Sequence, residues 1–266
     1  MSWTRRAWIL AGARWLDAFD REDTWRIAGF HAFFCFLVGR ILVGRVDGVG
    51  GGPGGLSPTG IDLVELLGAD ALGPVADRPG AVLAVLVGGL LAAPVSGWLL
   101  GHGPLARDLE TRSLRVPVLH SCREAVALGH LLGAAATVAT LALGSAAIVL
   151  LDAALRSPAS ALGSTLIAGL GAAVTTALVG SIFAALGSLV AVLLRRGRRA
   201  LLVAAIALGG LWALAGIPVL GRLSPFGHAG GLLAGGAGSA GGHVALALLG
   251  AALGWGVVAT FRRADL

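Results

Sequence analysis

Charge is scarce in this sequence. Only 13% of its 266 residues are charged, about half the share found in soluble domains, whereas 56% are hydrophobic and the mean hydropathy is +0.87. The apolar residues form runs of roughly 19 residues or more, long enough to cross a hydrocarbon layer about 30 Å thick. These features exclude an ordinary soluble domain and predict an all-α protein that crosses a membrane several times.

Lysine and tyrosine are absent, and only two cysteines occur. Cys35 and Cys122 are too few for a disulfide framework, and they lack the C-x-x-C spacing of metal and redox motifs. A net charge of +6 is compatible with nucleic-acid binding, but the arginines are distributed as a membrane topology distributes them. We also expect no cleavable signal peptide, because the first 26 residues lack an uninterrupted apolar core.

The N-terminal segment, residues 1–26, has the pattern of an amphipathic helix. Trp8, Gly12, Trp15, Leu16 and Phe19 recur at helical spacing on one face, and most of the arginines lie elsewhere. Tryptophan and arginine on such a helix are typical of the membrane headgroup region. We therefore predict an interfacial helix whose membrane-facing residues are Trp3, Trp8, Trp15, Leu16 and Phe19.

Six apolar runs follow this segment, each long enough for a transmembrane helix. They lie at about residues 27–46, 80–101, 125–151, 161–194, 200–220 and 243–261. The run 161–194 is too short for two crossings joined by a turn, so it predicts one long helix. Together the runs make residues 27–266 a single transmembrane domain.

The arginines set the orientation of this domain. With both termini in the cytoplasm, the inner segments hold 15 arginines, the outer segments hold four, and Arg40 lies within a span. Arginine is enriched in the cytoplasmic loops of membrane proteins, and every inner segment fits that rule. We therefore predict six spans, cytoplasmic termini, an inner loop 102–124, and outer loops 47–79 and 221–242.

Small residues within the spans predict close helix packing. Gly129 and Gly133 form a GxxxG pair, and Gly250 and Gly254 form another. Such pairs let two helix backbones approach closely. We expect most of them to serve packing within one bundle and some to form a subunit interface.

No group of residues predicts catalysis or metal binding in this chain. Ser239 and His243 are four residues apart, but their glycine-rich surroundings offer no rigid frame for a nucleophile and its base. We expect His31 to reach the inner headgroups from the first span. Four possible metal ligands lie near the inner loop, but their spacing matches no compact ligand motif, so we assign them no role: His102, His120, Cys122 and His130.

The inner loop overlaps a charged stretch, residues 104–129, "PLARDLETRSLRVPVLHSCREAVALG". A loop that only connected two spans could be a few residues long. This one is longer and mixes both signs of charge in "LARDLETRSLR", which favours docking on a protein surface over binding to anionic lipid. A solvated loop that only anchors the topology is the alternative.

This stretch resembles the corresponding segment of ABC-2 type transporter permeases. The similarity extends to "LSPF" before the last span, the ending "FRRADL", and the amphipathic helix before span one, which that family calls the elbow helix. It thus covers essentially the whole chain through short motifs. Within the charged stretch the matching positions are Asp108, Glu110, Ser113, Leu114, Pro117, Arg123 and Gly129.

The resemblance implies that the loop couples the permease to a separate cytosolic ABC ATPase. Mixed charges would set the register of that contact, and Leu109 or Leu114 would supply an apolar anchor. The chain has no Walker A motif, so ATP and Mg²⁺ would be bound by the ATPase, and this chain would hold no cofactor. The implied coupling residues are Arg107, Asp108, Leu109, Glu110, Arg112, Ser113, Leu114 and Arg115.

The family further implies two permease chains, two ATPase subunits, and export of a substrate across the bacterial inner membrane. A homodimer and a periplasmic or extracellular accessory protein are compatible with it, and no nucleic-acid partner is expected. Two other functions stay open: a secondary carrier or channel, and a membrane anchor or assembly factor without an ATPase. An ion-coupled carrier usually has a buried carboxylate, and none lies mid-membrane here.

Overall fold

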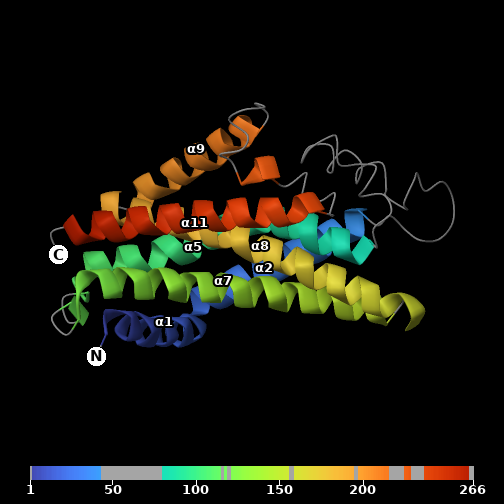
Figure 1. Cartoon of the computed structure of the whole chain (residues 1–266), viewed down its shortest axis with the longest axis horizontal. Helices are drawn as coiled ribbons and strands as arrows, with labels where there is room; N and C mark the ends of the chain where they lie inside the picture. Colours follow the sequence, from blue (N-terminus) through green and yellow to red (C-terminus); the bar gives the residue numbers. More distant parts are fainter. Residues whose placement is uncertain are drawn as a thin grey trace.

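The computed structural model describes residues 2–42, 80–114, 117–118, 121–155, 159–194, 197–215, 225–228 and 237–263. Within these ranges the chain is helical and forms no strand, which confirms the all-α prediction for this part of the protein (Figure 1). The elements are α1 (Trp3–Phe19), α2 (Glu22–Leu42), α5 (Gly80–Glu110), α7 (Arg123–Ala154), α8 (Ala159–Leu194), α9 (Gly197–Ala215), the 3₁₀ turn η4 (Phe226–His228) and α11 (Ala237–Arg263).

Four helices are long and apolar enough to cross a membrane. These stretches are Ala81–Glu110, Arg123–Asp152, Thr165–Leu194 and Ala240–Arg263. They correspond to the predicted spans 80–101, 125–151, 161–194 and 243–261, and the run 161–194 lies within the single helix α8, as predicted. The other two predicted spans, 27–46 and 200–220, begin in α2 and α9 and extend beyond the described residues. The protein is therefore a membrane protein, and six spans remain a prediction.

Helix α5 lies at the centre of the bundle and packs against α2, α7 and α8 (Figure 1). Leu83, Leu86 and Leu90 of α5 belong to one apolar cluster with Ile182 and Phe183 of α8, and each is at most 2% exposed. Phe183 also contacts Phe226 of η4, with ring centroids 5.8 Å apart. A motion of α5 would therefore disturb most of the core.

Two helix boundaries differ from the sequence prediction. The segment 1–26 is not one element, because α1 ends at Phe19 and α2 begins at Glu22 after a turn. The inner loop does not begin at residue 102, because α5 continues to Glu110, beyond the apolar run. Hydropathy marks where a helix leaves the hydrocarbon, whereas backbone hydrogen bonds can extend the helix into polar sequence. The outer loop 47–79 lies outside the described residues.

The helix ends that carry most of the described arginines meet at one end of the bundle, where both chain termini also lie (Figure 1). Arg107 near the end of α5 pairs with Asp23 of α2, at 3.4 Å, and Arg262 of α11 pairs with Glu124 of α7, also at 3.4 Å. We call this the arginine-rich end. It comprises the start of α1, the end of α5, the start of α7 and the end of α11.

Candidate functional site

The end of α5 packs against the bundle and then turns sharply. Leu105 and Ala106 are still buried in an apolar cluster with residues of α7, α8 and α11. The helix ends at Glu110, and Arg112 then adopts a left-handed backbone with φ 57°. The Thr111 hydroxyl and amide both donate to the Arg107 carbonyl at 2.9 Å, which closes the last turn. The chain therefore leaves α5 in a defined turn.

This turn divides the predicted coupling residues into an exposed and a buried group. We define the exposed tip as Glu110, Thr111, Arg112 and Ser113, all of which are exposed. Arg107 is exposed and Leu109 half-buried, whereas Asp108 and Leu114 are only 8% and 2% exposed. The two buried side chains are therefore occupied within this chain and are not available to a partner. Arg115 lies outside the described residues.

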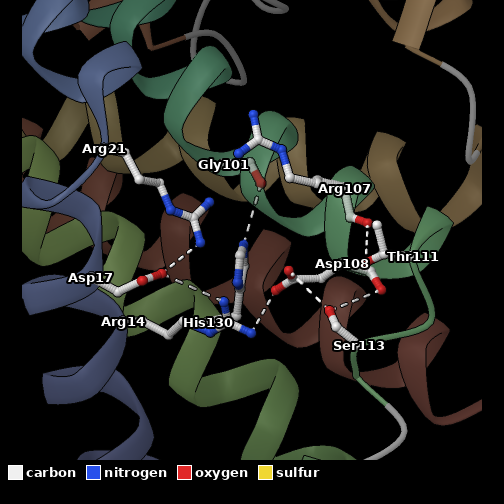
Figure 2. A network of polar contacts seen from close by, with 9 residues as sticks. All are labelled: Arg14, Asp17, Arg21, Gly101, Arg107, Asp108, Thr111, Ser113 and His130. Atoms are coloured by element: carbon white, nitrogen blue, oxygen red, sulfur yellow. Dashed lines mark hydrogen bonds and ion pairs between the residues drawn. The ribbon is translucent and has the colours of Figure 1, made fainter.

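Asp108 forms an ion pair with Arg14 of α1, which the sequence did not predict (Figure 2). Arg14 Nη2 lies 2.5 Å from Asp108 Oδ2, and the side chains are 24% and 11% exposed. Ser113 Oγ donates to Asp108 Oδ1 at 3.1 Å. One carboxylate thus joins α1 to the end of α5 and also holds the tip that follows it.

The ion pair belongs to a larger network at the junction of α1 with α2 (Figure 2). Asp17 lies 4.0 Å from Arg14 and 2.5 Å from Arg21, and Arg107 reaches Asp23 at 3.4 Å. The outer members are more exposed, with 50% of the Asp17 side chain and 63% of the Asp23 side chain accessible. Exposed pairs contribute little to stability, so Arg14 and Asp108 are the energetically important members.

A buried histidine supports this network from α7. His130 is 5% exposed, and its Nε2 lies 3.4 Å from the Gly101 carbonyl oxygen of α5, to which it donates because a carbonyl only accepts. Ser188 of α8 donates to the same oxygen at 3.2 Å. Beside His130 and Arg14 is a cavity of about 30 Å³. Small-molecule sites usually have about 300–1,000 Å³, so this network supports the structure and does not form a ligand pocket.

Helix α1 packs lengthwise along α7 (Figure 1). The contact runs over the GxxxG pair Gly129 and Gly133. A Cβ built on Gly129 would lie 2.6 Å from Leu10 Cβ, and one built on Gly133 would lie 2.7 Å from Arg14 Cβ. This pair therefore serves packing within the chain, as predicted for most of the small residues. It also brings Arg14 to the level of Asp108.

The other side of α1 is exposed and aromatic. The side chains of Trp3, Trp8 and Leu16 are 53%, 68% and 62% exposed, as a membrane-facing surface requires, although placement at a membrane interface remains a prediction. Trp15 is also exposed, and its indole N–H donates to Thr140 Oγ1 of α7 at 3.1 Å. Phe19 is half-buried against the apolar cluster of α5 and α7. Four of the five predicted membrane-facing residues are therefore exposed, whereas Phe19 points into the bundle.

We expect Gly133→Leu to loosen α1 from α7. The new side chain would collide with Arg14 Cβ and approach the Ala11 carbonyl oxygen, so α1 must move outward. A cysteine introduced by Ala11→Cys, at a buried position, should then react with maleimide about tenfold faster in a Cys122→Ser background. Gly144→Leu is the control, because that glycine of α7 faces open space. Equal labelling rates in the two variants would show that α1 does not depend on this close approach.

Two polar pairs, one buried and one partly buried, connect the apolar helices and were missed by sequence reasoning. His31 of α2 is 1% exposed with Nδ1 3.1 Å from Ser96 Oγ of α5, so the prediction that it reaches the headgroups is wrong. His243 Nε2 of α11 lies 2.7 Å from Thr175 Oγ1 of α8. Each histidine contacts a hydroxyl group on a different helix, and sequence spacing cannot identify such a contact.

Those metal-ligand candidates that the structure describes do not converge. Across the described ranges no group of three or more histidine, cysteine, aspartate or glutamate side chains could hold a metal ion. His102 and Cys122 are half-buried, and His120 lies outside those ranges.

Comparison with known proteins gives no family assignment: no protein-family model matches this chain, and no curated protein matches it.

Proposed function

We propose that this chain is the permease subunit of an ATP-driven exporter, with ATP and Mg²⁺ bound by a separate cytosolic ABC ATPase. The observation that carries the proposal is the exposed tip held on an anchored base. Glu110 and Arg112 present opposite charges to solvent at the arginine-rich end, while Asp108 and Leu114 fix the tip to the bundle. A docking element that transmits force needs both features.

Helix α5 gives such an element a mechanical connection to the membrane region. It forms one helix from Gly80 to Glu110, with Pro94 and Pro104 inside it, and packs along α8, the other long central helix. Packed cores respond to a displacement by switching between discrete arrangements more readily than by deforming continuously. A push on the tip would therefore move α5 against α8 and α2, which is how ATP-driven closure of an ATPase pair would open or close a path.

The proposed assembly has two permease chains and two ATPase subunits in the bacterial inner membrane, with six spans per permease and both permease termini in the cytoplasm. Four apolar helices and the gathering of arginine-bearing helix ends at one end of the bundle support this orientation. The proposed substrate path lies between the two permeases. The mostly apolar helices favour an amphiphilic substrate such as a lipid, peptide or drug.

The tip predicts a charge-dependent partner. In Glu110→Arg/Arg112→Glu, both exposed charges of the tip are reversed without touching Asp108 or Leu114. We expect co-purification of the ABC ATPase with the tagged permease from native membranes to fall about tenfold, because like charges then face each other across the contact. The matched control is Arg5→Glu/Asp20→Arg, which reverses one charge of each sign at exposed positions of α1 and beyond its end.

Both variants must elute as folded protein with wild-type thermal stability. If the tip variant retains the ATPase as well as the control does, docking does not occur at the tip. If no ATPase accompanies the wild type, a carrier, a channel or an anchor explains the chain better. An ATPase that binds but drives no ATP-dependent movement of any solute in proteoliposomes would favour the anchor.

A further inference from the structure

A large groove runs along the outside of the bundle between α7, α8 and α11. It encloses about 1340 Å³, more than the roughly 300–1,000 Å³ of most small-molecule sites. Its floor is apolar and well buried at Leu131, Ile182 and Leu246, which are 9%, 1% and 0% exposed. Only 17% of the apolar window of α11 is buried, so most of this helix beside the groove is exposed.

The glycines of α11 widen the groove and do not serve close helix packing. A Cβ built on Gly250 would lie 3.5 Å from Ile182 Cγ1, and one on Gly254 would lie 3.8 Å from Leu131 Cδ1, both ordinary contact distances. By contrast, a Cβ on Gly101 of α5 would overlap the Ala184 carbonyl oxygen of α8. Side chains would fit at Gly250 and Gly254. Because glycine has no side chain, these two positions leave open space along α11.

The groove is amphipathic along its length. Its polar end lies at the arginine-rich end and includes Glu124, Arg262 and Arg263, with a net formal charge of +1 from these three residues. Arg262 pairs with Glu124 at 3.4 Å and is 74% exposed, and Arg263 is exposed beside it in the last turn of α11. The indole of Trp3, 53% exposed, lines the same end. Arginine and tryptophan together are typical of the headgroup level of a membrane.

The dimensions of the groove match one membrane leaflet. Leu246 and Arg263 mark its two ends on α11 and are 17 residues apart, or about 26 Å of helix. One leaflet, including its headgroups, is about 21 Å thick, half of the 40–45 Å of a whole bilayer. A lipid with its phosphate at the arginines would therefore place its acyl chains along the apolar floor.

We propose that this groove binds an anionic phospholipid, with its phosphate at Arg262 and Arg263 and its acyl chains between α7 and α11. A second copy of this chain fits less well. A two-fold axis along the membrane normal would bring Arg262 and Arg263 of one copy toward the same residues of the other, and those like charges would repel. A phosphate supplies the missing negative charge. The site requires only that the chain crosses a membrane and is independent of any ATPase.

The test uses phosphatidylglycerol with a photoactivatable group in one acyl chain, added to the full chain in lipid nanodiscs. Labelled peptides should map to the groove faces of α7 and α11, and unlabelled phosphatidylglycerol should compete about tenfold better than phosphatidylcholine. Arg262→Gln/Arg263→Gln should weaken the competition by phosphatidylglycerol about 25-fold, since each arginine near an anionic headgroup contributes roughly fivefold. The control variant Arg5→Gln/Arg199→Gln removes the same charge from exposed positions outside the groove. It should leave the competition by phosphatidylglycerol unchanged.

A second variant tests the apolar part separately. Gly254→Leu should abolish groove labelling while the arginines remain, because the side chain fills the space beside Leu131. Labelling spread evenly over all lipid-facing helices, or equal competition by phosphatidylcholine, would overturn the proposal. Disulfide formation between two chains through an Ala251→Cys variant, with loss of lipid labelling, would identify a second copy as the occupant instead.

Discussion

The Arg14→Ala variant is expected to lose about 3 kcal/mol of folding free energy, because it leaves the Asp108 carboxylate buried without its cation. Ser113 Oγ would remain as a hydrogen-bond donor to Oδ1, but Oδ2 makes no hydrogen bond to any described residue and relies on Arg14 alone. The loss should appear as a lower midpoint of thermal unfolding in detergent. The folded fraction after heating is measured by size-exclusion chromatography.

The reverse deletion should cost much less. Asp108→Ala leaves Arg14, whose side chain is 24% exposed and retains Asp17 at 4.0 Å, so water and a second carboxylate compensate the cation. We expect a loss of about 1 kcal/mol. The double variant Arg14→Met/Asp108→Leu removes both charges and should recover most of the stability lost in Arg14→Ala, because a buried ion pair is often replaceable by apolar residues.

Arg26→Ala is the matched control for the arginine deletion. Arg26 pairs with Glu22 on the surface of α2, where the two side chains are 69% and 78% exposed, and exposed pairs contribute about 0.5 kcal/mol. A loss in Arg14→Ala no greater than in this control would show that Asp108 is hydrated in the folded protein. The tip would then have a less rigid base than proposed.

The sequence predicts the apolar helices well because their signal is local. A run of apolar residues longer than the hydrocarbon is thick indicates a span wherever it occurs, and α8 forms over residues 159–194 as one helix for that reason. The residues before Glu110 favour a helix, but the sequence did not predict that this helix continues α5, because a charged segment does not reveal whether it forms a separate helix. Leu105 and Ala106 stabilise that extension through residues far away in the chain.

The candidate site depends on pairings that sequence spacing does not contain. The sequence marks Asp108 as one of several charges in a polar stretch, and its partner is Arg14, 94 positions earlier. The same holds for His31, whose partner Ser96 is on another helix. The GxxxG pair at Gly129 and Gly133 was recognisable as a contact surface, but only the fold identifies α1 as the helix that occupies it.

The closest contact between α5 and α8 involves Gly97 and Gly101 of α5, which no sequence motif singled out. It also involves Gly180 of α8, which lies two turns from Gly187 on one face and was predicted to allow close packing. A Cβ on Gly97 would overlap the Gly180 carbonyl oxygen, and one on Gly101 would overlap that of Ala184, so α5 and α8 touch through their backbones. Backbone atoms cannot rotate away as a side chain can. Any larger residue must therefore separate the two helices along their whole contact.

We expect Gly101→Val to be the most damaging single change in the bundle, with a loss of about 3 kcal/mol or more. Separation of α5 from α8 would also break the hydrogen bond that Ser188 donates to the Gly101 carbonyl, and would strain the one from His130. Gly103→Val on the same helix is the control, because it shares the helix-propensity cost of valine while facing open space. Thermal unfolding of both variants in detergent isolates the packing effect as their difference. Similar midpoints would mean that α5 and α8 can separate without cost, and a tip fixed to α5 could then not transmit force to α8.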